Sequence, residues 1–134
     1  MIIRIPNAEA FANTAEIWID IPEEGIVAYQ GTGSYFICNP PVLDKDKDIL
    51  ILVKDAEEYK EKLLYEGWEG CTGYEDKEPH FFAARKGVIN LIVTDELQWY
   101  LRFAAATELA KKLNLLKKEE RISLFEQVLG KEKE

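Results

Sequence analysis

Hydrophobic and polar positions along the chain predict several short β-strands. Two apolar runs rich in β-branched residues, Gly25–Gln30 and Asp48–Lys54, are bounded by glycine or charged residues and predict core strands. The stretch Ile17–Ile21 alternates poorly and is followed by Pro22, so it is interpreted as either a strand or an extended connection. The core of the fold is therefore expected to form around the first two runs.

A β-hairpin is predicted later in the chain. The segments His80–Arg85 and Val88–Thr94 are separated by Lys86-Gly87, a pair typical of a tight turn between two strands. The residues before the hairpin, Thr72–Pro79, are mostly polar and are expected to form a loop.

Helical periodicity predicts three longer helices and two short ones. The longer helices are Ala56–Gly67, Glu96–Leu113 and Lys117–Leu129, in which apolar residues recur at the spacing of one helix face. The short helices are Ala8–Ala15 and Tyr35–Cys38, and the prolines that follow the second one must end it.

The same spacing predicts which side chains of the longer helices point inward. The residues expected on these inward faces are Tyr59, Leu63, Leu64, Trp68, Trp99, Phe103, Ala106, Leu109, Ala110, Ile122, Phe125 and Leu129. Tyr100 is interpreted either as a core residue, like Trp99 and Phe103, or as a residue that faces outward, and Asp95 is expected to cap the helix that starts at Glu96.

The order of these elements predicts one domain of the α+β class. A chain of 134 residues can bury a single modest core. Residues 1–130 are therefore expected to form a mixed β-sheet with helices packed on it and a C-terminal helical pair. Residues 131–134 are charged and are expected to be a disordered end.

Charge and cysteine content narrow the classes of function. The net charge of −8, with no basic stripe along the sequence, argues against a large sequence-independent contact with nucleic acid. Two cysteines, Cys38 and Cys71, suggest a reducing compartment in which both are buried or idle. The N-terminal apolar run is too short for a signal peptide and no segment is long enough to cross a bilayer. A cytoplasmic protein without a membrane partner is therefore expected.

The most informative chemistry lies between the two predicted core strands, where Gly33-Ser34 is followed by Asp46-Lys47-Asp48. Residues two apart on a strand point to the same side, so Asp46 and Asp48 would project together. Two such carboxylates repel unless a cation lies between them, which suits Mg²⁺. Gly33 would let the backbone approach a phosphate closely, and Ser34 offers a hydroxyl beside it. These residues predict a site for a metal-bound nucleoside triphosphate.

In these residues the chain resembles the DNA polymerase β-like nucleotidyltransferase superfamily, in which a helix-opening Gly-Ser precedes an Asp-x-Asp pair that leads a buried strand. The segment from Val88 through Leu129 resembles small nucleotidyltransferase-like proteins of tailed bacteriophages. The phage resemblance spans residues 31–130. It implies a minimal nucleotidyltransferase fold and a phage-encoded protein in the host cytoplasm.

The resemblance also implies a reaction, the Mg²⁺-dependent transfer of a nucleoside monophosphate to an unknown acceptor such as a host protein or RNA. Asp46 and Asp48 would be the catalytic metal ligands, and Gly33 and Ser34 would contact the phosphates. Lys47 would help to hold a phosphate or offset repulsion among the aspartates. The third carboxylate of the superfamily falls at Asn90, an amide that brings no negative charge and cannot act as a base.

Several interpretations stay open on the sequence alone. The chain is an active enzyme, a nucleotidyltransferase-fold protein that lost its chemistry and binds a nucleotide or inhibits a host protein, or a structural or oligomeric module. The acidic run before Asp48 is also compatible with a charged turn. Arg85 and Lys86 could reach a substrate phosphate or only aid solubility. His80 is either a residue at the solvent edge or a proton shuttle. The base, the acceptor and the oligomeric state do not follow from the sequence.

Overall fold

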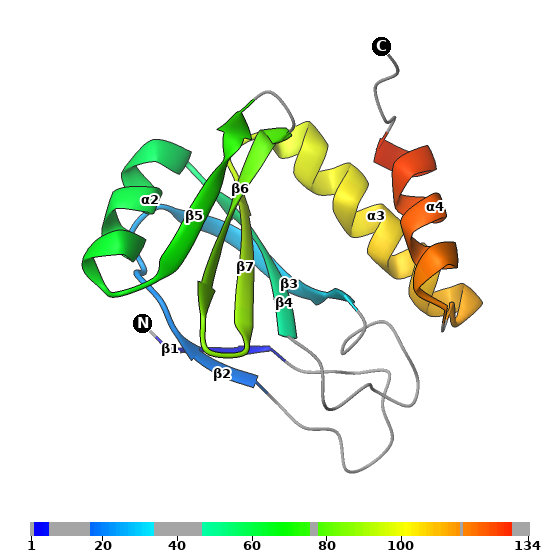
Figure 1. Cartoon of the computed structure of the whole chain (residues 1–134), viewed down its shortest axis with the longest axis horizontal. Helices are drawn as coiled ribbons and strands as arrows, with labels where there is room; N and C mark the ends of the chain where they lie inside the picture. Colours follow the sequence, from blue (N-terminus) through cyan, green and yellow to red (C-terminus); the bar gives the residue numbers. More distant parts are fainter. Residues whose placement is uncertain (1, 6–16, 34–46, 76–77, 116, 130–134) are drawn as a thin grey trace.

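The protein is described from a computed structural model of the chain (Figure 1). The structure describes residues 2–5, 17–33, 47–75, 78–115 and 117–129, and the side chains of all of these except residues 2–5, 17, 18, 70–75, 78 and 79. The helices predicted at Ala8–Ala15 and Tyr35–Cys38 lie outside the described residues.

A mixed β-sheet of five strands forms the centre of the fold (Figure 1). Its strands are β3 (Ile26–Thr32), β4 (Lys47–Val53), β5 (Glu69–Glu75), β6 (Glu78–Lys86) and β7 (Ile89–Thr94). They lie in the order β3-β4-β7-β6-β5, with β4 and β7 parallel and all other neighbours antiparallel. Because β4 and β7 run in the same direction, both begin at the same end of the sheet.

A second, two-stranded sheet pairs β1 (Ile2–Ile5) with β2 (Ile17–Asp20) in antiparallel orientation. The stretch that the sequence left open between a strand and an extended connection is therefore a strand. Strand β1 was not predicted, because a run of four residues carries too little pattern on its own.

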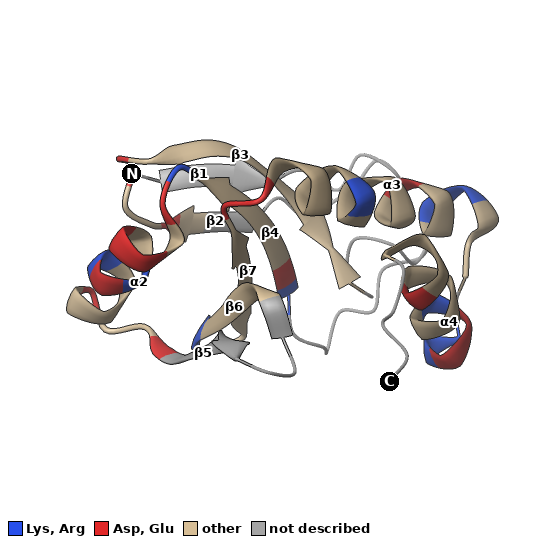
Figure 2. Ribbon diagram, turned by 90° about the horizontal axis from the view of Figure 1, so that it is seen from above, with Lys and Arg blue, Asp and Glu red and all other residues tan. Residues whose placement is uncertain are grey.

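The structure describes three helices, one on one face of the five-stranded sheet and two on the other (Figures 1 and 2). Helix α2 (Ala56–Tyr65) covers one face, while α3 (Leu97–Leu113) covers the other and α4 (Lys118–Leu129) packs on α3. None of the described helices combines the length and the apolar character that crossing a membrane requires.

Alternation along β4 explains why the sheet has a hydrophobic core on each face. Ile49, Ile51 and Val53 belong to a core with α2, which also includes Tyr59, Leu63, Trp68, Phe82, Leu91 and Val93. Leu50 and Leu52 point the other way and pack with Trp99, Tyr100, Phe103 and Leu129 of the C-terminal helices. A strand that is buried on both faces is apolar at successive positions, which is the run seen in the sequence.

Two aspartates from different segments cap the start of α2. The Asp55 carboxylate accepts a hydrogen bond from the backbone N–H of Glu58 at 3.2 Å, and the Asp95 carboxylate accepts one from the N–H of Ala56 at 3.0 Å. The prediction that Asp95 caps the next helix is therefore wrong. Glu96 occupies that capping position instead, and its own N–H donates to the Thr94 hydroxyl at 3.1 Å.

The α+β class, the mixed sheet and the C-terminal helical pair are confirmed. Besides β1, strand β5 was missed, because the predicted loop Thr72–Pro79 contains the end of β5 and the start of β6. Strand β5 lies at the edge of the sheet and its pairing with β6 has two register shifts. Pairing to a neighbouring strand, which no local pattern encodes, holds this polar segment extended.

The burial predictions for the helices were wrong at three positions. Leu64, Leu109 and Ile122 were expected inside and are exposed, and Tyr100, for which the sequence left both positions open, is buried. Tyr100 packs in the second core because the buried side of α3 faces Leu50 and Leu52 of β4. The other nine predicted inward residues are buried or half-buried.

Candidate functional site

A row of polar residues crosses the sheet at the end where β4 and β7 begin. The strand register sets Thr32 of β3 opposite Asp48 of β4, and Asp48 beside Asn90 of β7. It continues with Asn90 opposite Arg85 of β6, and Arg85 opposite Glu69 of β5. Directly paired residues point to the same side of a sheet, so all five share one face. Burial falls along this polar row, from the buried Thr32 to the exposed Arg85 and Glu69.

Asp48 and Asn90 meet at the middle of the polar row. The side-chain amide of Asn90 donates a hydrogen bond to the Asp48 carboxylate, with 3.2 Å between Nδ2 and Oδ1. Both side chains are half-buried and lie on the face that carries α3, because Asp48 is two residues before the buried Leu50. A polar pair that is only partly open to water interacts more strongly than one in bulk solvent.

Gly33 leaves room for the Asp48 carboxylate. The backbone of Gly33 has a φ of +76°, a conformation that residues with a Cβ rarely adopt. A Cβ built at this position would lie 2.9 Å from Cγ of Asp48 and would collide with one of its carboxylate oxygens. Glycine is therefore required here for two independent reasons, its backbone angle and its closeness to Asp48.

The turn at Gly33 is anchored by the residue before it. The hydroxyl oxygens of Thr32 and Thr107 lie 2.8 Å apart in a buried contact between β3 and α3. The Thr107 hydroxyl also donates to the backbone carbonyl of Phe103 at 3.0 Å. Because a hydroxyl has one proton to donate, Thr32 is the donor in the contact with Thr107. Helix α3 thus fixes the end of β3 directly beside the site.

The structure brings together three of the six site residues that the sequence predicted. Gly33, Asp48 and Asn90 come from three segments and are in contact or hydrogen-bonded. Lys47 does not join them, because it pairs with Ile89 on the face of the first core, opposite Asp48. Ser34 and Asp46 lie outside the described residues, each next in sequence to a residue that is described.

Thr32, Thr107 and Glu69 belong to the surroundings of the site and were not predicted from the sequence. The two threonines are separated by 75 positions, and no local motif marks either of them. Arg85 was considered for a phosphate contact, and the register places it beside Asn90. The register of the strands identifies the residues around Asp48. From the sequence, only the hairpin between β6 and β7 could have been used to place Arg85 beside Asn90.

His80 lies at the other end of the sheet. It is five residues before Arg85 on β6, which corresponds to roughly 17 Å along a strand. There its Nδ1 atom lies 3.0 Å from a carboxylate oxygen of Glu96, and its ring stacks on Trp99 with 6.2 Å between centroids. A role for His80 as a proton shuttle near Asp48 therefore has no support from this geometry.

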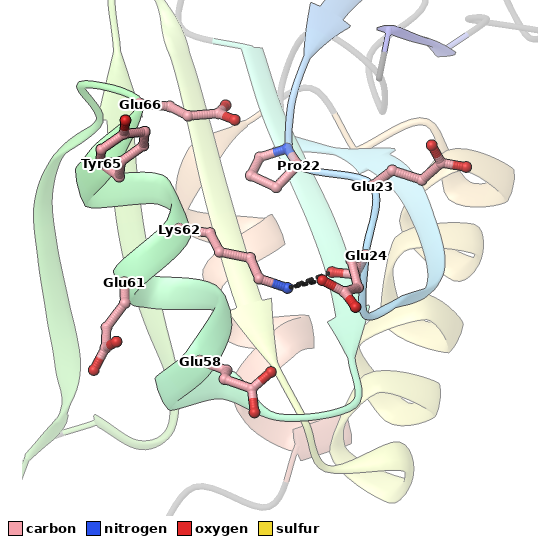
Figure 3. A pocket seen from close by; sticks show the side chains of 8 residues that line it. All are labelled: Pro22, Glu23, Glu24, Glu58, Glu61, Lys62, Tyr65 and Glu66. Atoms are coloured by element: carbon pink, nitrogen blue, oxygen red, sulfur yellow. Dashed lines mark hydrogen bonds and ion pairs between the residues drawn. The ribbon is translucent and has the colours of Figure 1, made fainter.

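A pocket of about 440 Å³ lies elsewhere, between α2 and the connection from β2 to β3 (Figure 3). Its lining residues are Pro22, Glu23, Glu24, Glu58, Glu61, Lys62, Tyr65 and Glu66. The ammonium of Lys62, the only cation in the lining, lies 3.1 Å from the Glu24 carboxylate (Figure 3). Five glutamates with one paired lysine would repel a polyphosphate, so this pocket does not suit a nucleotide.

Few of the described residues could bind a metal ion near Asp48. Within the described ranges, no three side chains of the types His, Cys, Asp and Glu are grouped so that they could hold a metal ion. Asp48 is the one described carboxylate of the predicted pair, and Asp46 lies outside those ranges. One observation bears on whether a metal ion would fit here. A Cβ at Gly33 would collide with the Asp48 carboxylate, so the glycine keeps the space beside this oxygen ligand free of a side chain.

Comparisons of the chain with protein-family models, with curated proteins and with solved structures found no match.

Proposed function

We propose that the protein binds a Mg²⁺-nucleoside triphosphate at the end of the sheet where β4 and β7 begin, and transfers the nucleoside monophosphate to an acceptor. The observation that supports this proposal most is the contact of the Asp48 carboxylate with Gly33 on one side and Asn90 on the other. These are three residues from separate segments that the nucleotidyltransferase resemblance had singled out.

In this proposal each residue has a distinct role. The backbone at Gly33 approaches the phosphates closely, and the hydroxyl of Ser34, the next residue, donates a hydrogen bond to them. Arg85, exposed and adjacent to Asn90 in the register, is positioned to neutralise phosphate charge at the open end of the polar row. The role that the sequence suggested for Lys47 passes to Arg85, because Lys47 points to the opposite face.

Mg²⁺ would be held by Asp48 together with Asp46. When bound, it would neutralise the charge that develops on the transferring phosphoryl group. Oxygen donors at a half-buried edge are the ligand type that this ion prefers. Asp48 would also keep its hydrogen bond with Asn90, which orients the carboxylate.

A second function, nucleotide binding without transfer, is favoured by the observed role of Asn90. Its amide faces Asp48 as a hydrogen-bond donor, where the superfamily has a third carboxylate. An amide donor satisfies the aspartate without adding negative charge, which lowers the need for a second cation. Such a protein would act as a nucleotide-dependent binding or inhibitory module for a host protein.

Calorimetry with ATP, CTP, GTP and UTP, with and without Mg²⁺, tests the binding step. We expect affinity for at least one triphosphate in the presence of Mg²⁺, and a loss of about tenfold or more in Asp48→Asn. Glu61→Gln, which makes the same change of charge at the α2 pocket, is the matched control and should bind as the unmodified chain does. Absence of binding to all four triphosphates, or equal binding by Asp48→Asn, contradicts the proposal.

Pyrophosphate release separates the two functions once binding is established. A labelled triphosphate is incubated with the protein and an extract of potential acceptors, and labelled product and pyrophosphate are followed. Release that disappears in Asp48→Asn identifies a transferase. Binding without release, combined with a gain of release in Asn90→Asp, identifies a nucleotidyltransferase-like protein in which the amide has replaced a catalytic carboxylate.

A further inference from the structure

We draw no further inference here: the strongest candidate, the acidic pocket between α2 and the connection from β2 to β3, is a cluster of glutamates around one paired lysine, and nothing else in the part of the chain that the structure describes points to a ligand there.

Discussion

Thr32 of β3 donates a hydrogen bond to the hydroxyl of Thr107 of α3, in a buried contact of 2.8 Å between segments 75 positions apart. The contact ties the helix that covers the second core to the strand end from which the Gly33 turn departs. Helix α3 is therefore part of the support of the proposed site, although no residue of the helix belongs to it.

The two threonines should differ in their contributions to stability. Thr107→Val leaves the Thr32 hydroxyl buried without an acceptor, which should lower the free energy of unfolding by about 1–3 kcal/mol. Thr32→Val should cost less, because the Thr107 hydroxyl keeps its bond to the Phe103 carbonyl. Urea denaturation measures both, and the double variant should cost less than the sum of the single ones. Additive effects would mean that the two hydroxyls do not interact.

Gly33→Ala tests the closeness of Gly33 to Asp48. Forcing alanine into a positive φ costs about 1–2 kcal/mol, and the collision with Asp48 should add about 1–3 kcal/mol. Gly87→Ala is the matched control, since Gly87 has a φ of +63° but nothing within 4 Å of a built Cβ. Thermal denaturation should show the larger loss for Gly33→Ala, and calorimetry should show weakened nucleotide binding for this variant alone. Equal losses in both variants would contradict the described contact.

Asn90→Asp should make stability depend on Mg²⁺. A second carboxylate beside Asp48 replaces an attractive contact with a repulsive one and should lower the free energy of unfolding by about 1 kcal/mol or more without metal. Added Mg²⁺ should raise the melting temperature of this variant more than that of the unmodified chain. Gln127→Glu on α4 adds the same charge at an exposed position and controls for net charge. A melting temperature that does not respond to Mg²⁺ would argue against an ion at Asp48.

Stability should fall at alkaline pH because of two buried tyrosines. Burial raises the pKa of Tyr59 above its usual value, with a smaller contribution from the Glu66 carboxylate, and burial also raises the pKa of Tyr100. Above about pH 10 the unfolded chain releases phenol protons that the folded chain keeps, so unfolding becomes more favourable as pH rises. Each tyrosine should contribute a slope of up to about 1.4 kcal/mol per pH unit, and this stability is fully present below pH 10.

Tyr59→Phe isolates one of these contributions. The Tyr59 hydroxyl donates to the backbone carbonyl of Pro22 at 2.8 Å, so its removal should cost about 1–2 kcal/mol at neutral pH. The variant should lose less stability than the unmodified chain between pH 10 and pH 11. Urea denaturation at several pH values gives both quantities, and parallel pH profiles for the two proteins would refute the assignment.

The sequence was a good guide where a pattern repeats locally. Strand β4 has a continuous apolar run because both of its faces are buried, and α3 shows its helical spacing through Trp99, Phe103 and Ala106. Segments whose structure depends on a distant partner were beyond the reach of such patterns. Strand β5 is polar and extended only because β6 pairs with it, and Asp95 caps a helix 39 residues away from it in sequence.

The residues of the candidate site also fall into two groups, those that the sequence could name and those that only the strand register places. Gly33, Asp48 and Asn90 could be named from the sequence because the chain resembles a nucleotidyltransferase motif at these positions, and their role as a site stays a prediction. The orientation of Lys47 could not, since a shift of one position in a strand moves a side chain to the other face. Thr32 and Arg85 take their places from register alone, and register is decided by pairing across the whole sheet.

The cap that Asp95 provides for α2 has a consequence for synthesis on the ribosome. Helix α2 emerges well before Asp95, so in a nascent chain interrupted after α2 only Asp55 caps the helix, and the backbone N–H of Ala56 lacks its acceptor. When β7 is synthesised, it fills the gap in the sheet between β4 and β6. Asp95 follows directly after it and accepts the hydrogen bond from Ala56. The core between the sheet and α2 should accordingly mature only when β7 arrives, and the second core later still, because it needs α3 and α4.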